Sequence, residues 1–187
     1  MILAAGESRR MGSPKALLDY EGASFLDTLI GLAAPRCSPV IVVLGAAADE
    51  IRAAARRPAV FVVNPEWRGG QITSMQCGLR AVPPEASGVL FTLVDHPAVS
   101  PATIDALVGS HPGKLLRVPR YGGRRGHPIW FSRELIPEFL ELPAGGAARD
   151  VVRRHAAETG FVDLDDAGIV ADIDDRADYA ALLGEAR

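Results

Sequence analysis

Short apolar runs alternate with amphipathic stretches through the first hundred residues. Continuous, short apolar runs predict buried strands at 1–4, 39–45 (PVIVVLG), 59–63 (AVFVV) and 88–95 (GVLFTLVD). Apolar side chains at helical spacing predict helices between them, from Phe25 to the break at Pro35 and over 47–56, 72–81 and 101–110, with Ser24 and Ser100 as N-caps. Strands that alternate with helices of about ten residues indicate a mostly parallel, doubly wound α/β sheet.

The second half of the chain has a different pattern. Two predicted strands, 114–119 and 127–131, flank a glycine-rich turn at 121–126, which indicates a hairpin-like insertion and hence a mixed sheet. Further helices are predicted near 133–140, 149–157 and 176–183, with a strand at 161–164. No linker-like segment interrupts this series, so we expect residues 1–187 to form a single domain.

Composition and charge narrow the class of protein. Of the 187 residues, 48% are hydrophobic and 23% charged, which is typical of a globular protein. The net charge of −3 argues against a nucleic-acid partner, which would require a basic surface. The two cysteines have no metal-site spacing. No apolar run approaches the roughly 20 residues of a membrane span, and no signal-peptide pattern is present, so we expect a cytoplasmic protein without a membrane partner.

The first predicted strand runs directly into a glycine turn followed by cations, in the segment LAAGESRRMGSPK from Leu3 to Lys15. Ala5 and Gly6 allow a ligand to approach the backbone closely, and the glycine permits a positive φ. Successive amides in such a turn form an anion-binding nest, and Arg10 and Lys15 supply charge for a polyphosphate. The segment is neither the GxxxxGK(S/T) loop nor the GxGxxG fingerprint. On local chemistry alone, a surface loop with solvated charges is the alternative.

Several motifs in the same order resemble those of the MobA-like nucleotidyltransferase family, and of its molybdenum cofactor cytidylyltransferase branch in particular. The family's LAAGxSxRMGxxK and NPxWxxGxxxSxxxGL have counterparts in LAAGESRRMGSPK and in NPEWRGGQITSMQCGL at 64–79. Counterparts also exist for VDHP (94–97), RRGHP (124–128) and DIDD (172–175). The resemblance implies a nucleotide-diphospho-sugar transferase-like fold. It also implies phosphate contacts from Leu3, Ala4, Ala5, Gly6, Ser8, Arg10 and Lys15, with Arg10, Lys15 and Asp95 as the catalytic residues.

Acidic residues follow the last of the early strands and recur near the C-terminus. Asp95 ends a predicted buried strand, and ligands of doubly wound folds bind beyond the carboxyl ends of strands. A carboxylate there can hold Mg²⁺ together with phosphate oxygens, or it can simply cap the next turn. Asp172 and Asp174 share one face if their segment is extended, although a solvated acidic loop explains them equally well. The resemblance favours Asp95 as a Mg²⁺ ligand, completed by Asp174 or Asp172, and we take Asp174.

Small residues recur every four positions in the 70–78 segment. Gly70, Ser74 and Gly78 share one helix face, which leaves room either for a flat base or for close packing on the sheet. In the family that the chain resembles, this region helps to bind the base, with Asn64 as a loop anchor. The resemblance therefore adds Asn64, Gly70, Ser74 and Gly78 to the predicted nucleotide-binding residues.

The later part of the chain contains the predicted acceptor side. The resemblance places RRGHP (124–128) there, where cations suit a phosphorylated pterin, and His127 is the predicted binding residue; a solvated β-turn is the alternative. Relatives often carry a GDxGAR-like segment before a late helix, but 144–149 reads AGGAAR, so the aspartate is missing. Relatives also have several apolar residues before the first motif. Only three residues precede Ala4 here, which predicts a short first strand with a less well packed edge.

These features, with the resemblance, predict Mg²⁺-dependent transfer of CMP from CTP to the terminal phosphate of molybdopterin, with release of pyrophosphate. The choice of cytosine follows from the resemblance alone. CTP-using members tend to read LAAG, and guanylyl members LAGG with Asp before the lysine, whereas this chain has Ala5 and Pro14. A molybdenum hydroxylase is the expected partner that receives the product. Two alternatives stay open: transfer to another phosphorylated acceptor (a sugar phosphate or phospho-acid), and a non-catalytic chaperone that carries the cofactor to a molybdoenzyme.

Overall fold

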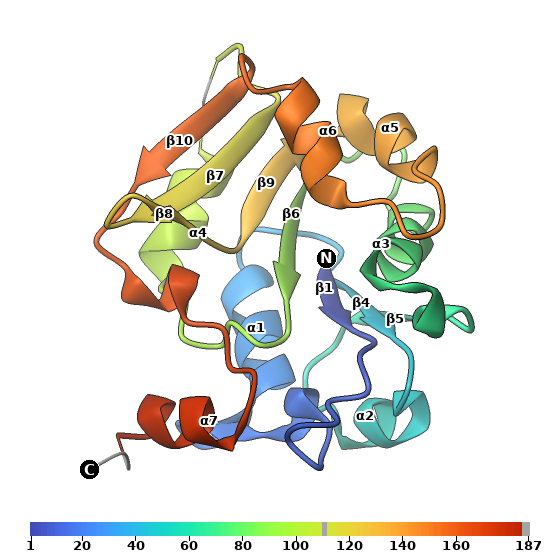
Figure 1. Cartoon of the computed structure of the whole chain (residues 1–187), viewed down its shortest axis with the longest axis vertical. Helices are drawn as coiled ribbons and strands as arrows, with labels where there is room; N and C mark the ends of the chain where they lie inside the picture. The colour runs from blue at the N-terminus through green and yellow to red at the C-terminus, as the bar shows by residue number, and fades with distance from the viewer. Residues whose placement is uncertain (110–111, 185–187) are drawn as a thin grey trace.

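The computed structural model describes residues 1–109 and 112–184, and an eight-stranded sheet forms its centre (Figure 1). The strands follow the order β10-β7-β9-β6-β1-β4-β5, with β8 paired to β7. They are β1 (Ile2–Ala4), β4 (Ile41–Leu44), β5 (Val60–Val63), β6 (Gly88–Leu93), β7 (Leu116–Tyr121), β8 (Arg124–Arg125), β9 (Ile129–Ser132) and β10 (Thr159–Asp163). A separate short hairpin, which the hydrophobic pattern did not predict, pairs β2 (Asp19–Tyr20) with β3 (Ala23–Ser24).

Helices form where the periodicity predicts them. They are α1 (Phe25–Ala33), α2 (Ala48–Ala54), α3 (Gln71–Leu79), α4 (Pro101–Val108), α5 (Ile136–Leu140), α6 (Ala148–Arg154) and α7 (Arg176–Leu182). Both predicted N-caps are confirmed: the hydroxyls of Ser24 and Ser100 accept hydrogen bonds from the amides of Asp27 and Thr103. The predicted helix over 101–110 ends at Val108, and Ser110 lies outside the described residues.

The first half of the chain builds the parallel part of the sheet. β1 pairs in parallel with both β4 and β6, and β4 pairs in parallel with β5. Its strands are continuous apolar runs because helices cover both faces of this part of the sheet. β1 is short as predicted, but the expected loose packing is wrong, since Met1 and Ile2 are buried between neighbouring strands and helices.

The second half adds the mixed part of the sheet. β9 runs antiparallel to both β6 and β7, while β10 pairs in parallel with β7. The predicted antiparallel pairing of 114–119 with 127–131 is confirmed by the register Leu116–Phe131. The tight turn itself joins β7 to β8, with Gly122 and Gly123 at φ values of 55° and 78°.

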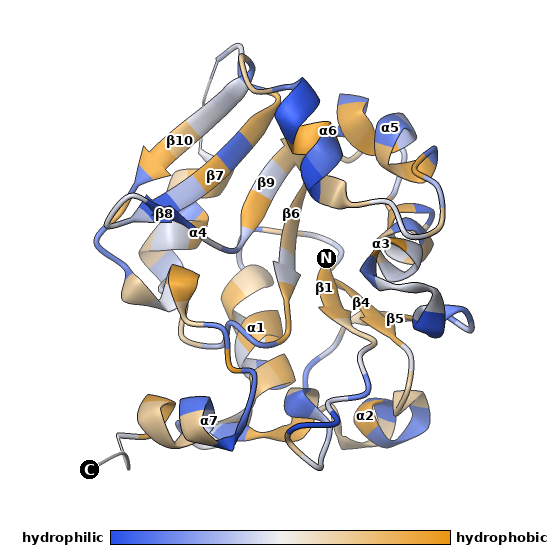
Figure 2. Ribbon diagram, viewed as in Figure 1, coloured by the Kyte–Doolittle hydropathy of each residue, from blue (hydrophilic) through white to orange (hydrophobic). Residues whose placement is uncertain are grey.

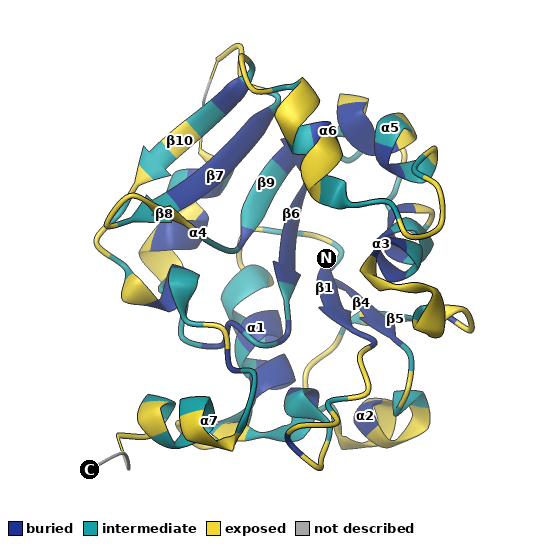
Figure 3. Cartoon of the chain, viewed as in Figure 1, coloured by how far each residue is buried: buried dark blue, intermediate teal, exposed yellow. Residues whose placement is uncertain are grey.

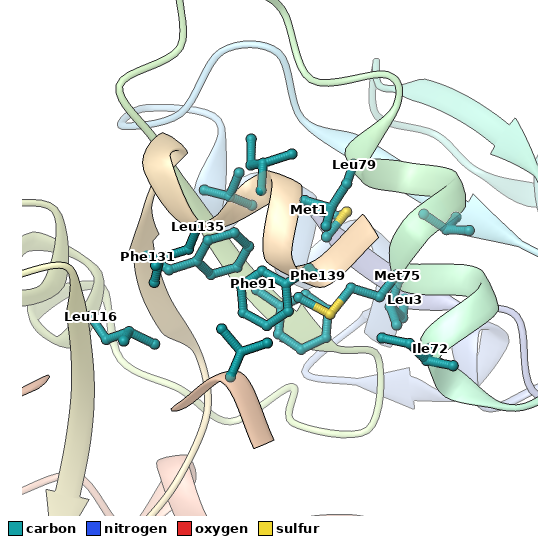
Figure 4. Packing of buried hydrophobic residues seen from close by; sticks show 14 residues of the cluster. Met1, Leu3, Ile72, Met75, Leu79, Phe91, Leu116, Phe131, Leu135 and Phe139 are labelled. Atoms are coloured by element: carbon teal, nitrogen blue, oxygen red, sulfur yellow. The ribbon is translucent and has the colours of Figure 1, made fainter. Parts of the chain in front are cut away.

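Alternate residues of the segment 1–4, which contains β1, face two different apolar cores. Met1 and Leu3 pack with residues of α3, α5 and α6 in the cluster of Figure 4, whereas Ile2 and Ala4 pack with α1 on the other face. The central strands β1, β4 and β6 are mostly apolar and buried, whereas exposed positions are frequent on the outer helices and loops (Figures 2 and 3). No helix in the described part of the chain is long and apolar enough to cross a membrane.

The edge strand β5 exposes Val60 and Val63, each about 45% accessible, yet its free carbonyl groups have partners. Arg52 donates to the Phe61 carbonyl at 3.4 Å, and the Cys77 thiol lies 3.7 Å from the Val63 carbonyl oxygen. Such contacts protect an edge from pairing with other strands. They also give Cys77 a structural position at the edge of the sheet.

Candidate active site

A cavity of about 360 Å³ opens at the carboxyl ends of β1 and β6. Ligands of doubly wound folds bind at this edge of the sheet. Its wall combines the predicted motif with residues from four other segments: Leu3, Ala4, Ala5, Gly6, Ser8, Arg9, Arg10, Pro14, Lys15, Ala16, Ile51, Trp67, Gly70, Gln71, Ser74, Leu93, Val94, Asp95 and Asp174. We call it the first cavity.

The motif loop folds around Ser8. The Ser8 carbonyl accepts hydrogen bonds from the amides of Met11 and Gly12, and its hydroxyl accepts one from the amide of Lys15 at 3.1 Å. Ser8 and Gly12 have positive φ values of 52° and 75°. The expectation of a positive φ at Gly6 is therefore wrong, because the left-handed turn is made two residues later. Gly6 instead leaves space, since a Cβ atom there would meet no atom within 4 Å.

Four charged side chains from distant parts of the chain meet in the first cavity. The ammonium of Lys15 lies 3.2 Å from Asp95 Oδ2 and 2.8 Å from Asp174 Oδ1, and Arg10 Nη2 lies 2.8 Å from Asp174 Oδ2. The Ile173 amide donates to the Asp95 carbonyl at 2.9 Å, which joins the two acidic segments. Hydrogen bonds from Lys15 and then Arg10 hold the pKa of Asp174 below its usual value. Sequence reasoning therefore selected residues that the fold brings together.

The acidic pair has free coordinating capacity. Asp95 Oδ1 is buried and has no hydrogen-bond partner. His96 Nε2 lies 3.8 Å from this oxygen. The described residues contain no group of three or more His, Cys, Asp or Glu placed to hold a metal ion. Two carboxylates nevertheless fit Mg²⁺, which takes one or two protein carboxylates together with phosphate oxygens. Asp172 is exposed and does not line the cavity, so Asp174 is the acidic residue placed beside Asp95.

The predicted base-binding residues divide into two sets. Gly70 and Ser74 line the first cavity, whereas Asn64 and Gly78 do not. Gly78 lies against the sheet, where an added Cβ atom would collide with Met1 and Val43. A nucleotide contact at Gly78 is therefore not supported, because its face is filled by helix–sheet packing.

Two residues that sequence reasoning did not assign to the site lie outside its wall and hold neighbouring elements in place. Gly45, directly after β4, brings Ala5 and Trp67 together, since a Cβ atom there would lie 2.8 Å from Trp67 Cβ. Gln76 donates through Nε2 to the carbonyls of Phe139 and Leu142, at 3.0 and 2.9 Å, and so fixes the end of α5 against α3. A glycine that ends a buried strand was the available signal for Gly45. The sequence offered no signal for Gln76, because its partners lie more than sixty residues away.

A second cavity, of about 530 Å³, adjoins the first and shares Gly70 and Gln71 with it. Apolar side chains of α3 and of the mixed part of the sheet line it, among them Met75 and Phe91. Its two cationic residues are Arg125, from β8, and Arg149, from α6. The AGGAAR segment and His127 also line it, so both residue sets that the resemblance placed on the acceptor side meet here.

Two histidines contact each other, His96 beside Asp95 and His127 in the wall of the second cavity. The rings of His96 and His127 are 5.1 Å apart, and the Nδ1 atoms of both are buried without a hydrogen-bond partner. Burial lowers the pKa of His96. Burial, and secondarily the neighbouring His96, lowers the pKa of His127 to about 4. Both rings are therefore neutral near pH 7.

Known proteins resemble the chain over nearly its full length. The family described as MobA-like NTP transferase domain matches residues 1–159. Nicotine blue oxidoreductase of Paenarthrobacter nicotinovorans is 34% identical, over 93% of this chain and 90% of its own length. Molybdenum cofactor cytidylyltransferase of Escherichia coli is 29% identical, over 96% of this chain and 92% of its own.

Solved structures agree with this similarity. The crystal structure of Rv0371c from Mycobacterium tuberculosis H37Rv has a TM-score of 0.84 and 32% identity, with 98% of this chain and 96% of the other covered. A second structure of that protein, in complex with manganese, has a TM-score of 0.80 and 31% identity, with coverages of 98% and 96%. With its fold, its motifs and this similarity, the chain belongs to the MobA-like NTP transferase family, a family of nucleotidyltransferases with the nucleotide-diphospho-sugar transferase fold.

Proposed function

We propose that this protein transfers CMP from CTP to the terminal phosphate of molybdopterin and releases pyrophosphate. The observation that carries the proposal is the arrangement of two adjoining cavities. The first contains Arg10, Lys15 and the Asp95–Asp174 pair, and the second is lined by two arginines together with apolar side chains. A triphosphate fits the first arrangement, and a flat heterocycle with an anionic group fits the second.

The proposed reaction needs no protein nucleophile. An oxygen of the acceptor phosphate forms a bond to the α-phosphorus of CTP, and the bond from that phosphorus to the bridging oxygen of pyrophosphate breaks. Gly70 and Gln71 line both cavities, so the two substrates meet beside them. Lys15 and Arg10 stabilise the charge that develops on the departing pyrophosphate, and catalysis rests on positioning and charge neutralisation.

Asp95 and Asp174 are the residues that would hold a divalent cation, with Mg²⁺ as our choice. Such a cation, when bound, neutralises charge on the phosphate oxygens. The unpartnered Asp95 Oδ1 supports this assignment, and Asp174 presents oxygens that Lys15 and Arg10 hold in the free protein. The manganese in the mycobacterial relative is consistent with a divalent cation in proteins of this fold.

The choice of cytosine as the base and of molybdopterin as the acceptor has its own support. Ala5 and Pro14, both in the wall of the first cavity, follow the pattern of the CTP-using branch. The name of the Escherichia coli relative supports the same substrates. A specific observation favours a second acceptor, however: the AGGAAR segment, which lacks the aspartate of many relatives, lines the second cavity. A sugar phosphate or phospho-acid is therefore the alternative acceptor.

The Paenarthrobacter relative introduces a different class of reaction, since its name states an oxidoreductase and its identity to this chain is 34%. The cationic and acidic groups of the first cavity favour phosphate chemistry over redox chemistry. A non-catalytic carrier of the molybdenum cofactor, which would deliver it to a molybdenum hydroxylase, would use the second cavity without turnover.

One assay separates these functions. The protein with Mg²⁺ is given each of the four nucleoside triphosphates, with and without molybdopterin, and pyrophosphate is measured. We expect release only with CTP and molybdopterin together. Release with an added sugar phosphate instead of the pterin would select the alternative acceptor. No release under any condition would exclude both transferases, and parallel incubation with nicotine blue and NADH or NADPH would then test the redox activity.

A further inference from the structure

Two buried polar side chains contact each other at the first cavity, Ser74 in its wall and Asn64 behind it. Asn64 is 4% exposed and does not line the cavity, whereas Ser74 is 3% exposed and does. Asn64 Nδ2 lies 3.0 Å from the hydroxyl oxygen of Ser74 and 2.9 Å from that of Thr73. Asn64 therefore reaches a ligand in this cavity only through Ser74.

The orientation of the Asn64 amide follows from its third contact. Its Oδ1 atom accepts a hydrogen bond from the backbone amide of Glu66 at 3.0 Å. Because a backbone N–H can only donate, the amide oxygen must face Glu66, and the NH₂ group must face the two hydroxyls. Both hydroxyl oxygens are thus acceptors of protons from Asn64.

The two hydroxyls differ in where their own protons can go. The single hydroxyl proton of Thr73 has two carbonyl acceptors within reach, those of Glu66 and Gly70, at 3.0 and 2.9 Å. Ser74 has no acceptor for its proton among the residues that the structure describes, and its side chain faces the first cavity. A buried hydroxyl proton without an acceptor costs stability, and a ligand that supplies the acceptor recovers it.

We propose that Asn64 is a positioning residue that makes Ser74 an obligatory hydrogen-bond donor to the base of the bound nucleotide. The inference rests on the proposed function in taking a nucleotide as the ligand. The site then selects a base that offers an unprotonated ring nitrogen at this point, as cytosine does at N3. Uracil carries a proton on N3, and guanine carries protons on N1 and N2 beside its carbonyl group, so both present a donor where cytosine presents an acceptor.

The direction of the hydrogen bond between Asn64 and Ser74 is tested by Asn64→Asp. This substitution keeps the shape of the side chain and replaces its donor group with an acceptor. Ser74 would then donate to the introduced carboxylate and present only lone pairs to the cavity. In calorimetric titrations we expect this variant to reduce the ratio of CTP to UTP affinity about three- to tenfold, which is the effect of one hydrogen bond. The added negative charge repels all triphosphates alike. The ratio of CTP to UTP affinity therefore reports the direction of the hydrogen bond and not the added charge.

Companion variants separate polarity from a general loosening of the loop. Ser74→Ala is expected to reduce the same ratio to a similar extent, and Asn64→Asp is expected to add nothing in that background. Thr73→Val, which removes the other partner of the Asn64 amide, is expected to retain the ratio. An unchanged ratio in Asn64→Asp, or an equal loss in Thr73→Val, overturns the proposal.

Neutron diffraction of the deuterium-exchanged free protein tests the same inference without a ligand. The deuteron on Ser74 is expected to point into the cavity, and a deuteron that points toward Asn64 would overturn the assigned polarity. A wild-type protein that binds no triphosphate would instead remove the proposed function and the choice of ligand. The neutron map decides the donor direction separately from that result.

Discussion

The two cavities hold similar cations in different electrostatic states. In the first cavity, Lys15 and Arg10 are engaged with carboxylates at 2.8–3.2 Å. In the second, neither Arg125 nor Arg149 has a carboxylate partner among the described residues; Arg125 instead lies 4.8 Å from the Phe161 ring. A ligand of the first cavity must therefore replace existing ion pairs, whereas an anion in the second meets free guanidinium groups.

This difference follows from how each cavity is assembled. The first lies where parallel strands end, and the loops after β1 and β6 meet the segment before α7, so opposite charges converge. The second forms between α3, α6 and the antiparallel strands, and its charged residues come from a hairpin and a helix surface. We infer that a ligand of the first cavity exchanges places with the carboxylates that pair with Lys15 and Arg10. An anionic ligand of the second cavity is attracted directly to its guanidinium groups.

The largest expected effect comes from removing an acidic partner in the first cavity. Asp95→Ala should lower turnover at least about a hundredfold, because loss of one charge-stabilising group commonly has this effect. Pyrophosphate release measures turnover, and circular dichroism checks the fold. Asp163→Ala, which removes an exposed carboxylate that pairs with Arg120 outside both cavities, is the matched control with normal turnover. Normal turnover in Asp95→Ala would remove the metal assignment.

Replacing Lys15 should change two affinities in opposite directions. In Lys15→Met, CTP should bind roughly 10- to 100-fold more weakly, because a charge-assisted contact is lost. Free of Lys15, the Asp95–Asp174 pair should bind Mn²⁺ more tightly in the absence of nucleotide, as measured by electron paramagnetic resonance. Lys114→Met, at a lysine that donates to the Ala157 carbonyl and lines neither cavity, is the control. Weaker Mn²⁺ binding by Lys15→Met would contradict the exchange of partners.

The second cavity should show an effect on the acceptor alone. Arg149→Met is expected to raise the KM for the acceptor about tenfold through loss of one charged contact, while CTP affinity stays the same. Arg153→Met, on the exposed face of the same helix, should change neither. A change of CTP affinity in Arg149→Met would show that the two cavities are not separate binding sites.

The smallest effect is expected from His127, in the wall of the second cavity. It concerns the stability of the fold. The folded-state pKa of His127, about 4, lies below its ordinary value of 6.5, so the unfolded chain binds more protons between these values. The contribution of neutral His127 to the free energy of unfolding is therefore fully present above about pH 6.5, and it is lost as the pH decreases toward 4. His127→Asn should reduce this loss by on the order of 1 kcal/mol, as urea unfolding across that range would measure. An identical pH dependence of stability in wild type and variant would show that His127 does not cause this loss.

The sequence predicted most of the fold because its signals are local. The apolar runs around Val42 and Leu90 could only be buried strands, and Ser24 and Ser100 begin helices through contacts three residues away. The β2–β3 hairpin was missed because its strands contain only two residues each. The turn at Ser8 was misplaced to Gly6, since glycine is the usual left-handed residue and a hydrogen-bonded loop holds Ser8 there instead.

The sequence by itself determined the family, the order of the elements and the residues of the phosphate loop, because these are properties of neighbouring positions. The tertiary structure decided which distant groups meet: Lys15 with Asp174, Gln76 with the end of α5, and Asn64 with Ser74 behind the cavity wall. It also showed that Gly78 serves packing while Gly70 lines both cavities. The physical reason is that hydrogen-bond direction and ion pairing depend on distances of about 3 Å between atoms, which only the folded chain establishes.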